Sequence, residues 1–513
     1  MDGAPEGSLK LSLLKALSER ERACAPDALD FLATHDEPLV FLDDFLSSQA
    51  SGQAGFVLSL SELKSFADSR LAQKSAMQVT DIVAGSVFQP PSRSVVPQFA
   101  LSINNSDVTG KSRCTGTVDD FVNYFGDRYR RLSAPLRNAA SSEGFSTLRD
   151  LKQGVSGKKA RVVGIIYSKK ITKNGHMLFE IEDETGLAPC LVSRDSPLFA
   201  EANTLLTDEV VAFDVYAHND LLIAKAFFKP GRVFQERRKT KIAKDVSIAF
   251  LSDLHVGSKL FMQEKFKNFL RFLNGEGSEE LREQAGKIKY ISIAGDLTDG
   301  IGVYPSQEKE LLTKDIFTQY EIFCEFLKGI PEYIEVIVAP GNHDAVRTAE
   351  PQPCLPEEFT RSLRGYDNIH FVGNPSVHKI EGLDLLIYHG TSVDGIISNS
   401  PALKNGYDFP ERVAQELLNK RHLCPIYGED PLVPEARDYL VIEGQPDIFH
   451  FGHVHKNGYN EDYFGTVIVN SGTWQSQTDF QIRMGHNPTP CILPIYDMHT
   501  GKMETLDFNK IEF

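Results

Sequence analysis

Apolar residues at helical spacing mark the first seventy residues of the chain. Leucines recur three residues apart at positions 11, 14 and 17, and again at positions 29 and 32, which is the pattern of helices with one apolar face. Ser59, followed by Glu62, matches a capping box that would start a further helix. We therefore predict a small helical N-terminal domain over residues 1–70. It is either a docking domain for another protein or a small packed bundle, and the pattern favours neither.

The helical periodicity fades over residues 71–115. The segment 89–94 (Gln-Pro-Pro-Ser-Arg-Ser) and Pro97 disfavour helices, because proline lacks the backbone donor that a helix needs. This stretch is predicted to be a flexible linker without activity of its own.

A different pattern predicts a domain over residues 116–240. Its first part is a helix over 117–131, with an apolar stripe formed by Val118, Phe121, Val122, Phe125 and Tyr129. Short strand-like runs follow, separated by turn sequences. They lie at 161–167, 176–181, 187–192, 209–216 and 221–228. Five such strands in about seventy residues are typical of a small Greek-key barrel of the OB type.

Barrels of this type often bind single-stranded nucleic acid through a basic groove and aromatic platforms. Lys169, Lys170 and Lys173 are predicted to lie in the first hairpin loop, but the predicted strand faces carry few aromatic residues. A barrel that serves as a protein interface is therefore favoured. The basic segment 237–241 is interpreted as a solvated connection to the last domain, with a DNA-backbone contact as the secondary interpretation.

Residues 241–513 alternate β-branched runs with helical segments, which is the pattern of an α/β fold. The runs at 246–251, 290–294, 336–339, 383–388 and 447–451 each end directly before polar residues of metal-binding type. In α/β sheets, sites assemble at the carboxyl ends of strands because the loops there converge on one crevice. Glycines flank most of the polar residues, and we interpret them as positions where the backbone approaches a metal closely. The candidate site residues are Asp253, His255, Asp296, Asp299, Asn342, His343, His389, His453 and His455.

Composition narrows the function classes. A chain of 513 residues predicts two to four domains. With 70 acidic against 54 basic residues, the formal net charge is −16, so the chain does not bind nucleic acid by charge alone. A nuclease is still allowed, because metal ions would supply the local positive charge.

The same sequence argues against membrane and disulfide-bonded classes. No apolar run approaches the length that spans a bilayer, and residues 1–10 lack the features of a secretory signal. The seven cysteines are scattered, odd in number and never spaced as C-x-x-C. We expect neither a disulfide framework nor structural zinc, and the expected location is the cytoplasm.

Each polar motif alone is a weak signal, because a single D-x-H or G-H-x-H is more often a turn or an ordinary histidine. Five such motifs in order, each directly after an apolar strand, have no structural explanation. Nitrogen and oxygen donors without thiolate suit manganese, iron or zinc, and they argue against copper(I) or an iron–sulfur centre.

The motif set resembles the calcineurin-like metallophosphoesterase superfamily, whose pattern is D-x-H, G-D, G-N-H-[DE], H and G-H-x-H. The resemblance covers residues 246–478 and implies a two-sheet α/β sandwich with two divalent metal ions. The implied ligands of the first metal are Asp253, His255, Asp296 and His455. Those of the second metal are Asp296 as a bridge, Asn342, His389 and His453.

The resemblance also assigns catalytic roles. His343 would face the scissile phosphate without binding a metal, and Asp299 would orient it and hold its tautomer. A bridging carboxylate lowers the repulsion between two dications, and the paired ions would bind a phosphate oxygen and lower the pKa of a water. His343 would then stabilise the developing charge or protonate the leaving oxygen.

Residues 116–513 further resemble the small subunits of archaeal family-D DNA polymerases. The resemblance rests on the order of barrel and phosphoesterase and on three segments: 116–121 (Gly-Thr-Val-Asp-Asp-Phe), 253–258 (Asp-Leu-His-Val-Gly-Ser) and 470–478 (Asn-Ser-Gly-Thr-Trp-Gln-Ser-Gln-Thr). It implies a manganese-stimulated, proofreading 3′→5′ exonuclease in a heterodimer with a large polymerising subunit. The implied substrate is DNA with a single-stranded or mismatched 3′ end, and a sliding clamp is a further implied partner. Eukaryotic relatives have lost the metal ligands, so the complete set here favours the active type.

Two other functions are kept as alternatives. One is a non-catalytic scaffold subunit of a polymerase; the intact set of predicted metal ligands argues against it. The other is a stand-alone metallophosphatase or nucleotidase; the predicted barrel and the N-terminal extension argue against it. Trp474, the only tryptophan, is either a base-stacking platform near the site or part of the core.

Overall fold

The protein was analysed as a computed structural model, which describes residues 6–20, 22–35, 38–48, 57–67, 70, 88–100, 106–138, 144–153, 157–233 and 239–513. Its first segment is helical, as predicted, with α1 (Glu6–Ser18), α2 (Pro26–Ala33) and α3 (Pro38–Ser48). A short parallel pair of strands, β1 (Ala23–Cys24) and β2 (Val57–Leu58), joins them. The predicted capping box is confirmed, because the backbone N–H of Ser59 donates to the Glu62 carboxylate at 2.9 Å and that of Glu62 donates to the Ser59 hydroxyl at 3.3 Å.

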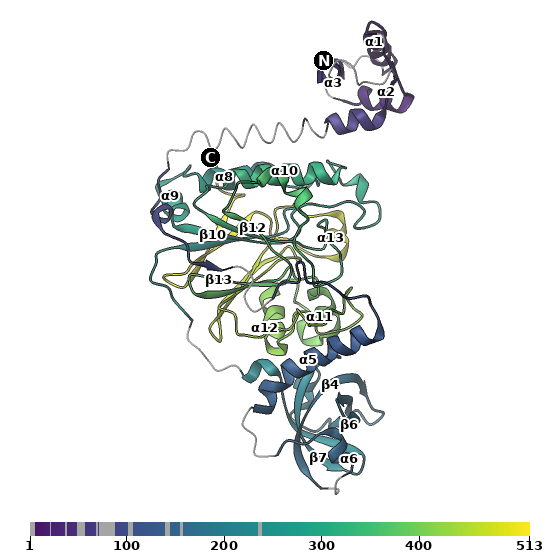
Figure 1. The fold of residues 1–513 in the computed structure, drawn as a ribbon, viewed down its shortest axis with the longest axis vertical. Helices are drawn as coiled ribbons and strands as arrows, with labels where there is room; N and C mark the ends of the chain where they lie inside the picture. Colours follow the sequence, from purple (N-terminus) through teal and green to yellow (C-terminus); the bar gives the residue numbers. More distant parts are fainter. Residues whose placement is uncertain are drawn as a thin grey trace.

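The five strands predicted for the middle of the chain form a closed barrel (Figure 1). They are β4 (Lys159–Ile171), β5 (Met177–Asp183), β6 (Gly186–Val192), β7 (Val210–His218) and β8 (Leu221–Phe228), in the order β4-β5-β6-β8-β7. Two short helices, α6 (Leu148–Lys152) and α7 (Phe199–Ala202), lie before and within it. The first strand is longer than predicted and includes Lys169, whose ammonium donates to the carbonyls of Asn203 and Leu205. Lys169 therefore holds the barrel together and does not lie in a loop.

The helix before the barrel, α5 (Val118–Asn138), is longer than predicted, and its buried face overlaps the predicted stripe only in part. Val118 and Val122, predicted in the apolar stripe, are exposed, whereas Tyr124, Leu132 and Leu136 are buried. The stripe prediction is therefore confirmed for Tyr129, which is buried, and wrong for Val118 and Val122, because this helix packs on two partners at once. Its buried face also carries a charge, Arg128, which apolar periodicity does not reveal.

The C-terminal part contains two six-stranded sheets, each of mixed direction. The first has the order β12-β11-β10-β9-β18-β19, with β9 (Ser247–Leu251), β10 (Ile288–Ala294), β11 (Glu335–Ala339), β12 (Ile369–Phe371), β18 (Ile492–Asp497) and β19 (Lys502–Asp507). The second has the order β16-β17-β15-β14-β13-β3, with β3 (Phe99–Ala100), β13 (Ser376–Ile380), β14 (Leu383–Ile387), β15 (Ile448–Phe451), β16 (Asn457–Tyr463) and β17 (Thr466–Ser471). The predicted strands correspond to β9, β10, β11, β14 and β15.

Helices cover the outer faces of both sheets, and an apolar core lies between the sheets (Figure 1). The first sheet packs against α8 (Gln263–Leu273), α9 (Glu279–Lys287) and α10 (Ile316–Lys328). The second packs against α11 (Val393–Asn399) and α12 (Pro410–Lys420). Strands β9 and β10 are buried along their whole length, which explains why they are continuous apolar runs in the sequence and not alternating ones.

Part of the predicted linker belongs to this sandwich. Phe99 and Ala100 form strand β3, which pairs with Ile380 and Lys379 at the edge of the second sheet. The buried Asp107 carboxylate accepts from the backbone N–H of Gly373 at 2.8 Å. The prediction of a flexible linker is therefore wrong for residues 88–100 and 106–115. Residues 71–87 and 101–105 lie outside the described residues.

The connection between barrel and sandwich also makes contacts. Lys239 lies over the ring of Tyr496, with its ammonium 4.8 Å from the ring centroid, and donates to the carbonyl of Gly501. This part of the basic segment is therefore held against the sandwich, which differs from the predicted solvated connection. Arg237 and Arg238 fall outside the described residues.

A buried ion pair joins α5 to the sandwich. The guanidinium of Arg128 donates to the Asp438 carboxylate at 2.8 Å, and neither side chain is more than 1% exposed. Arg128 also donates to the carbonyl of Pro425 at 2.8 Å, and His422 lies 2.8 Å from Asp438. Burial alone would raise the pKa of Asp438, but His422 and Arg128 hold it below its usual range.

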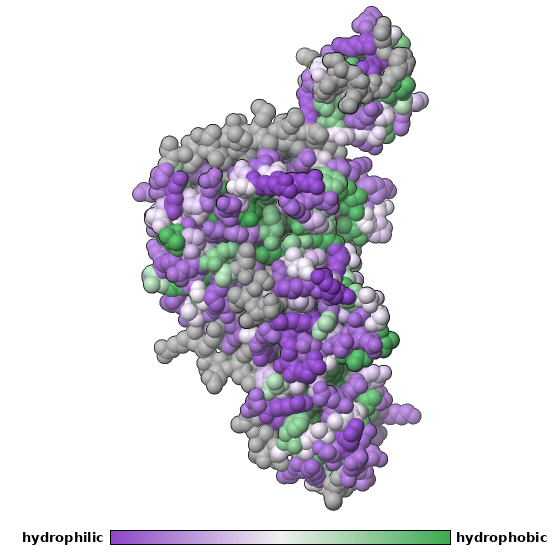
Figure 2. Space-filling view, in the orientation of Figure 1, coloured by the Kyte–Doolittle hydropathy of each residue, from purple (hydrophilic) through white to green (hydrophobic). Residues whose placement is uncertain are grey.

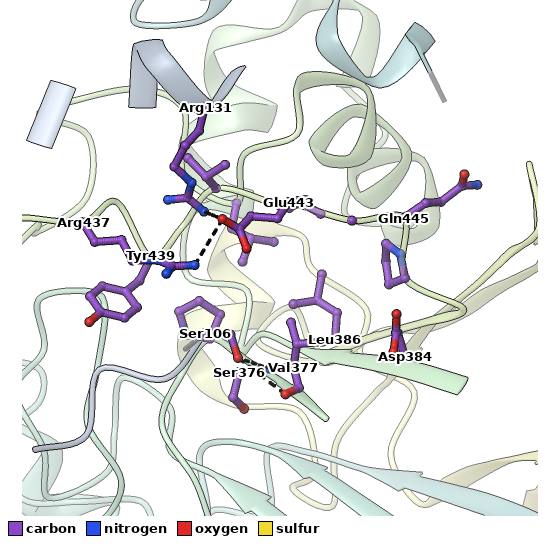
Figure 3. Close-up of a pocket in the computed structure, with 16 residues that line it drawn as sticks. Ser106, Arg131, Ser376, Val377, Asp384, Leu386, Arg437, Tyr439, Glu443 and Gln445 are labelled. Carbon is purple, nitrogen blue, oxygen red and sulfur yellow. Dashed lines mark hydrogen bonds and ion pairs between the residues drawn. The ribbon is translucent and has the colours of Figure 1, made fainter. Parts of the chain in front are cut away.

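Two further polar contacts cross the same junction. Lys420 of α12 forms a buried ion pair with Glu209 of the barrel. A pocket nearby is lined by α5, the second sheet and the loop before β15; there Arg131 and Arg437 both bind Glu443, at 2.9 and 3.2 Å (Figure 3). Because these groups come from separate parts of the chain, barrel, α5 and sandwich hold one another in a fixed arrangement.

No helix in the described part of the chain is long and apolar enough to cross a bilayer. The seven cysteines are all free thiols.

The Arg128–Asp438 pair gives a test of this junction. Replacing Asp438 with Ala leaves the Arg128 charge buried without its carboxylate, which should lower the free energy of unfolding by about 3–5 kcal/mol. Chemical denaturation followed by the fluorescence of the single tryptophan, Trp474, measures this directly. The exposed pair Glu357–Arg364, with side chains 71% and 69% exposed, provides the control, and Glu357→Ala should cost less than about 1 kcal/mol. Equal losses in the two variants would contradict the role assigned to the buried pair.

Candidate metal centre

The predicted site residues all follow the carboxyl ends of strands. Asp253 and His255 follow β9, Asp296 and Asp299 follow β10, and Asn342 and His343 follow β11. These three strands are parallel neighbours in the first sheet. His389 follows β14, and His453 and His455 follow β15, its parallel neighbour in the second sheet. The two sheets therefore deliver their polar loops to the same end of the sandwich.

One cluster contains Asp253, His255 and His455. Their ligand atoms all lie within 4.8 Å of one another. The Nε2 atoms of His255 and His455 are 3.0 Å apart, and His455 Nε2 is 3.4 Å from a carboxylate oxygen of Asp253. All three side chains are buried. These are three of the four residues predicted for the first metal.

A second cluster contains Asp296, His389 and His453, again with ligand atoms within 4.8 Å of one another. The side-chain oxygen of Asn342 lies 2.8 Å from His389 Nε2 and 3.1 Å from His453 Nδ1. The four residues predicted for the second metal are therefore together in the structure.

Asp296 lies between the two clusters. Its Oδ2 is 3.4 Å from His389 Nε2 on one side and 3.8 Å from His255 Nε2 on the other. It also lies 4.0 Å from His343 Nε2. This is the position that the predicted bridging role requires of a carboxylate.

In three of these histidines, the ring nitrogen that faces away from the centre is held by a group that can only accept a hydrogen bond. His389 Nδ1 donates to the carbonyl of Ala294 at 2.8 Å, and His255 Nδ1 donates to the Asp299 carboxylate at 3.1 Å. His453 Nε2 donates to the Asp394 carboxylate at 3.2 Å. In a neutral imidazole, a proton fixed on the outer nitrogen leaves a lone pair on the other nitrogen. These three lone pairs point into the centre, which is the arrangement of metal-binding histidines.

The charge balance of the centre also suits cations. Burial alone would lower the pKa of His389, but Asp296 beside it raises the pKa to about 10. His255 is likewise disfavoured as a cation by burial, but its bond to Asp299 and the nearby carboxylates raise its pKa to about 9. The same negative potential that stabilises protons on these imidazoles would stabilise metal cations in their place.

The backbone at the centre is strained. Asp253, His255, Asp296, His453 and His455 all have positive φ angles, between 50° and 72°. Residues with a side chain adopt this left-handed conformation rarely, and each costs of order 1 kcal/mol or more. Such strain persists where the surrounding structure over-determines it, as at a binding site. No pattern in the sequence indicates these angles.

The glycines beside the site leave space for the neighbouring side chains. A Cβ atom on Gly341 would collide with the Asp296 carboxylate, and one on Gly452 would collide with that of Asp253. On Gly295 it would come within 2.6 Å of His389 Nδ1. The glycines thus make room for the side chains of the cluster.

His343 lies at the centre, but Asp299 does not hold it in the predicted way. The Asp299 carboxylate bonds to His255, as described above, and it also accepts from Gln307 at 3.0 Å and Gln475 at 3.2 Å. His343 Nδ1 instead donates to the main-chain carbonyl of Asp299 at 2.8 Å. The prediction that the Asp299 side chain orients His343 is therefore wrong. The backbone of the same residue fixes the tautomer and leaves His343 Nε2 facing the centre.

The chain matches a known protein family over part of its length and known proteins over most of it. Residues 248–458 match the model of the family that comprises the B subunits of DNA polymerases alpha and epsilon. The chain is 45% identical to the DNA polymerase II small subunit of Methanocaldococcus jannaschii over 77% of this chain and 66% of that protein. It is 39% identical to the protein of that name in Methanothermobacter thermautotrophicus, over 79% of this chain and 82% of that one. For the protein of that name in Halobacterium salinarum, identity is 35% over 95% of this chain and 97% of that one.

The chain belongs to the family of DNA polymerase II small subunits of archaeal family D. A structural match to asparaginyl-tRNA synthetase from Pyrococcus horikoshii covers only 16% of this chain and 22% of that one, at 17% identity and a TM-score of 0.15, and carries no argument.

Several residues that hold the centre of this family member were not predicted. Asp394 on α11 binds His453, and Gln481 donates to His455 Nδ1 at 2.8 Å. The Asp344 carboxylate accepts from the backbone N–H groups of Gly341 and Leu297, at 2.8 and 3.2 Å, and so ties the loop after β11 to the loop after β10. Asp344 is part of the predicted G-N-H-D motif, so the sequence could have indicated that it belongs to the site. The sequence does not indicate Asp394 or Gln481, because neither lies in or beside a recognisable motif.

Trp474 is buried in the core. Its side chain is 0% exposed and packs against Phe266, Phe269 and Phe508, with ring centroids 5.2 to 5.7 Å apart. It is not available for stacking on a base.

The contact between Asp394 and His453 can be tested. Asp394→Ala removes the acceptor that fixes the outer nitrogen of His453, and such losses typically lower metal affinity by about 10–100-fold. Titration with Mn²⁺, followed by calorimetry, should show a weakened site in this variant. Asp408→Ala provides the control, because that carboxylate is 61% exposed and its ion partner is Lys456. An unchanged Mn²⁺ affinity in Asp394→Ala would contradict the assignment.

Proposed function

We propose that this chain is the 3′→5′ exonuclease subunit of a heterodimeric family-D DNA polymerase and hydrolyses DNA phosphodiesters with two divalent metal ions. In this proposal, residues 241–513 form a calcineurin-like phosphoesterase domain, and the five-stranded barrel is of the OB type. The supporting observation is the complete donor set at the strand ends, with the outer nitrogens of His255, His389 and His453 each fixed by an acceptor. A chain selected only as a scaffold has no need for this arrangement.

Two groups of residues would hold the metals. The first group is Asp253, His255, His455 and Asp296, and the second is Asp296, Asn342, His389 and His453. Donors of nitrogen and oxygen without thiolate suit Mn²⁺, with iron or zinc as alternatives. When bound, two such ions polarise a phosphoryl oxygen and make a water nucleophilic at neutral pH.

The chain's own residues would supply position and proton transfer. Asp296 lies between the two groups, and its carboxylate would offset their charge. The backbone N–H of His343 donates to Asp296 Oδ1 at 2.9 Å, so the loop that carries His343 is fixed relative to the bridging carboxylate. The Nε2 of His343 is the atom that would exchange a proton with the substrate, because its Nδ1 is held by the carbonyl of Asp299.

The partner would be a large polymerising subunit, since the curated relatives are named small subunits of DNA polymerase II. The net charge of −16 fits a subunit whose partner makes most of the contacts with DNA. The barrel carries exposed apolar residues that would suit a protein contact; these are Tyr167, Ile171 and Leu187.

Asp296→Ala should abolish nuclease activity without unfolding the protein. The carboxylate contacts both clusters, so its loss disturbs them together, whereas β10 is held by its buried apolar residues. Digestion of a 3′-labelled single strand with Mn²⁺ measures the activity, and co-purification with the large subunit measures assembly. Asp408→Ala should retain both properties. Substantial digestion by Asp296→Ala would remove Asp296 from the bridging role. A wild-type protein that assembles but digests neither DNA nor a free phosphomonoester would favour the scaffold function.

Substitutions of the neighbouring residues Asn342 and His343 should affect different properties, metal binding in one case and proton transfer in the other. His343→Ala should keep both metals and near-normal DNA affinity, while turnover falls by about 10²–10⁴-fold, the usual contribution of general acid–base catalysis. Asn342→Ala should first lower the occupancy of the metal site formed with His389 and His453. Metal content and single-turnover rates of the two variants decide this. Loss of a metal from His343→Ala, or cleavage at the wild-type rate, would contradict the role of His343.

A further inference from the structure

Helix α13 (Asp479–Met484) lies beside the metal centre and exposes apolar side chains. Phe480, Ile482 and Met484 are 57%, 58% and 58% exposed. Figure 2 shows hydrophobic surface in the part of the sandwich where Figure 1 labels α13. Exposed apolar residues that gather beside a site often contact a ligand or a partner. The proposed mechanism does not use them.

One hydrogen bond and one ring contact connect the two ends of this segment, directly or through further residues, to the two clusters. At its start, Gln481 donates to His455 Nδ1 at 2.8 Å, and Thr478 caps the helix with a complete capping box. After its end, the ring of His486 lies on that of Tyr407, with centroids 4.0 Å apart. The Tyr407 hydroxyl donates to Asp394, which holds His453. Helix α13 is therefore fixed at the rim of the centre, and its apolar side chains are not used in holding it there.

Helical geometry divides the three side chains. Phe480 and Met484 are four residues apart and share one face of the helix, whereas Ile482 points to another side. Gln481 occupies the direction of the centre. The ring of Phe480 and the thioether of Met484 thus form one surface next to the side that faces His455.

This surface fits a nucleobase better than a phosphate. An unpaired base presents a flat, uncharged face that stacks on aromatic and apolar side chains. Stacking on a base does not require a positively charged surface. It therefore suits a protein with a net charge of −16, which does not attract the phosphates of DNA. Six helical residues are about 9 Å long at 1.5 Å per residue, and nucleotides follow one another at about 3.4 Å along a strand. The helix can therefore contact two or three terminal nucleotides while the scissile phosphate lies at the centre.

We propose that Phe480 and Met484 of α13 bind the bases at an unpaired 3′ end and so position the strand for hydrolysis. This inference rests on the proposed exonuclease function and deepens it. Paired bases are stacked inside a duplex and do not offer their faces to the helix. The contact would thus favour frayed or mismatched ends over matched ones.

The test uses two single-stranded oligonucleotides, one normal and one lacking bases at its last three 3′ positions. With Mn²⁺, the full-length wild-type chain should show a KM about tenfold lower for the normal strand, the size of one stacking contact. Phe480→Ala and Met484→Ala should reduce this preference, with kcat unchanged. Phe480→Trp should keep it. Ile482→Ala, equally exposed but on the other side of the helix, is the matched control and should behave as the wild type. Hydrolysis of bis(4-nitrophenyl) phosphate and metal content confirm an intact centre in each variant.

Several outcomes would overturn the inference. They are an unchanged preference in Phe480→Ala and Met484→Ala, an equal loss on both oligonucleotides, or a loss of preference in Ile482→Ala alone. Normal digestion by Phe480→Ala with loss of binding to the large subunit would assign the surface to that protein instead. If the wild type cleaves neither strand, the proposed function fails. The base preference measured by fluorescence anisotropy in binding then still decides the role of Phe480.

Discussion

The candidate metal centre depends on holding many polar and ionisable side chains close together in a buried space. Five histidines, three carboxylates and one amide come together at one end of the sandwich, where unpaired polar groups are costly. The parallel strands of both sheets, all pointing the same way, bring the loops there. Left-handed backbone at five of the candidate ligand positions and glycines opposite the carboxylates then allow the side chains to meet. The apolar core between the sheets fixes the strands firmly enough to maintain this strain.

The same rigidity extends beyond the sandwich. Helix α5 contacts both the barrel and the sandwich: the Tyr129 hydroxyl donates to the barrel carbonyl of Val163 at 2.9 Å, while Arg128 is paired with Asp438. The Lys420–Glu209 pair holds the barrel to α12, which packs on the second sheet. A protein bound to the barrel would therefore be held in a defined direction relative to the metal centre.

Much of the site could be predicted from the sequence, since each ligand follows an apolar strand and stands in a short motif. Asp253, Asp296 and His389 are examples: a mostly apolar, buried strand leads directly to each of them. Prediction failed where contacts come from distant segments. Asp394 and Gln481 contact ligand histidines across the fold, and the backbone carbonyl of Asp299, not its carboxylate, holds His343. Likewise, the buried face of α5 includes Arg128. Burial of this charge is explained only by its ion pair with Asp438, which lies far away in the sequence.

The sequence alone determined the order of the helical, barrel and α/β parts, the strands that lead to the site and the polar residues that gather there. Local periodicity and strand-end chemistry are encoded in neighbouring residues. Only the tertiary structure decided how the two sheets combine their loops, which groups hold each histidine, and where Trp474 and the predicted linker lie. Phe99, for example, completes a sheet whose next strand begins at Ser376, and Trp474 is buried by Phe266 and Phe508. Such pairings are determined by packing between residues far apart in the chain, for which the local pattern carries no signal.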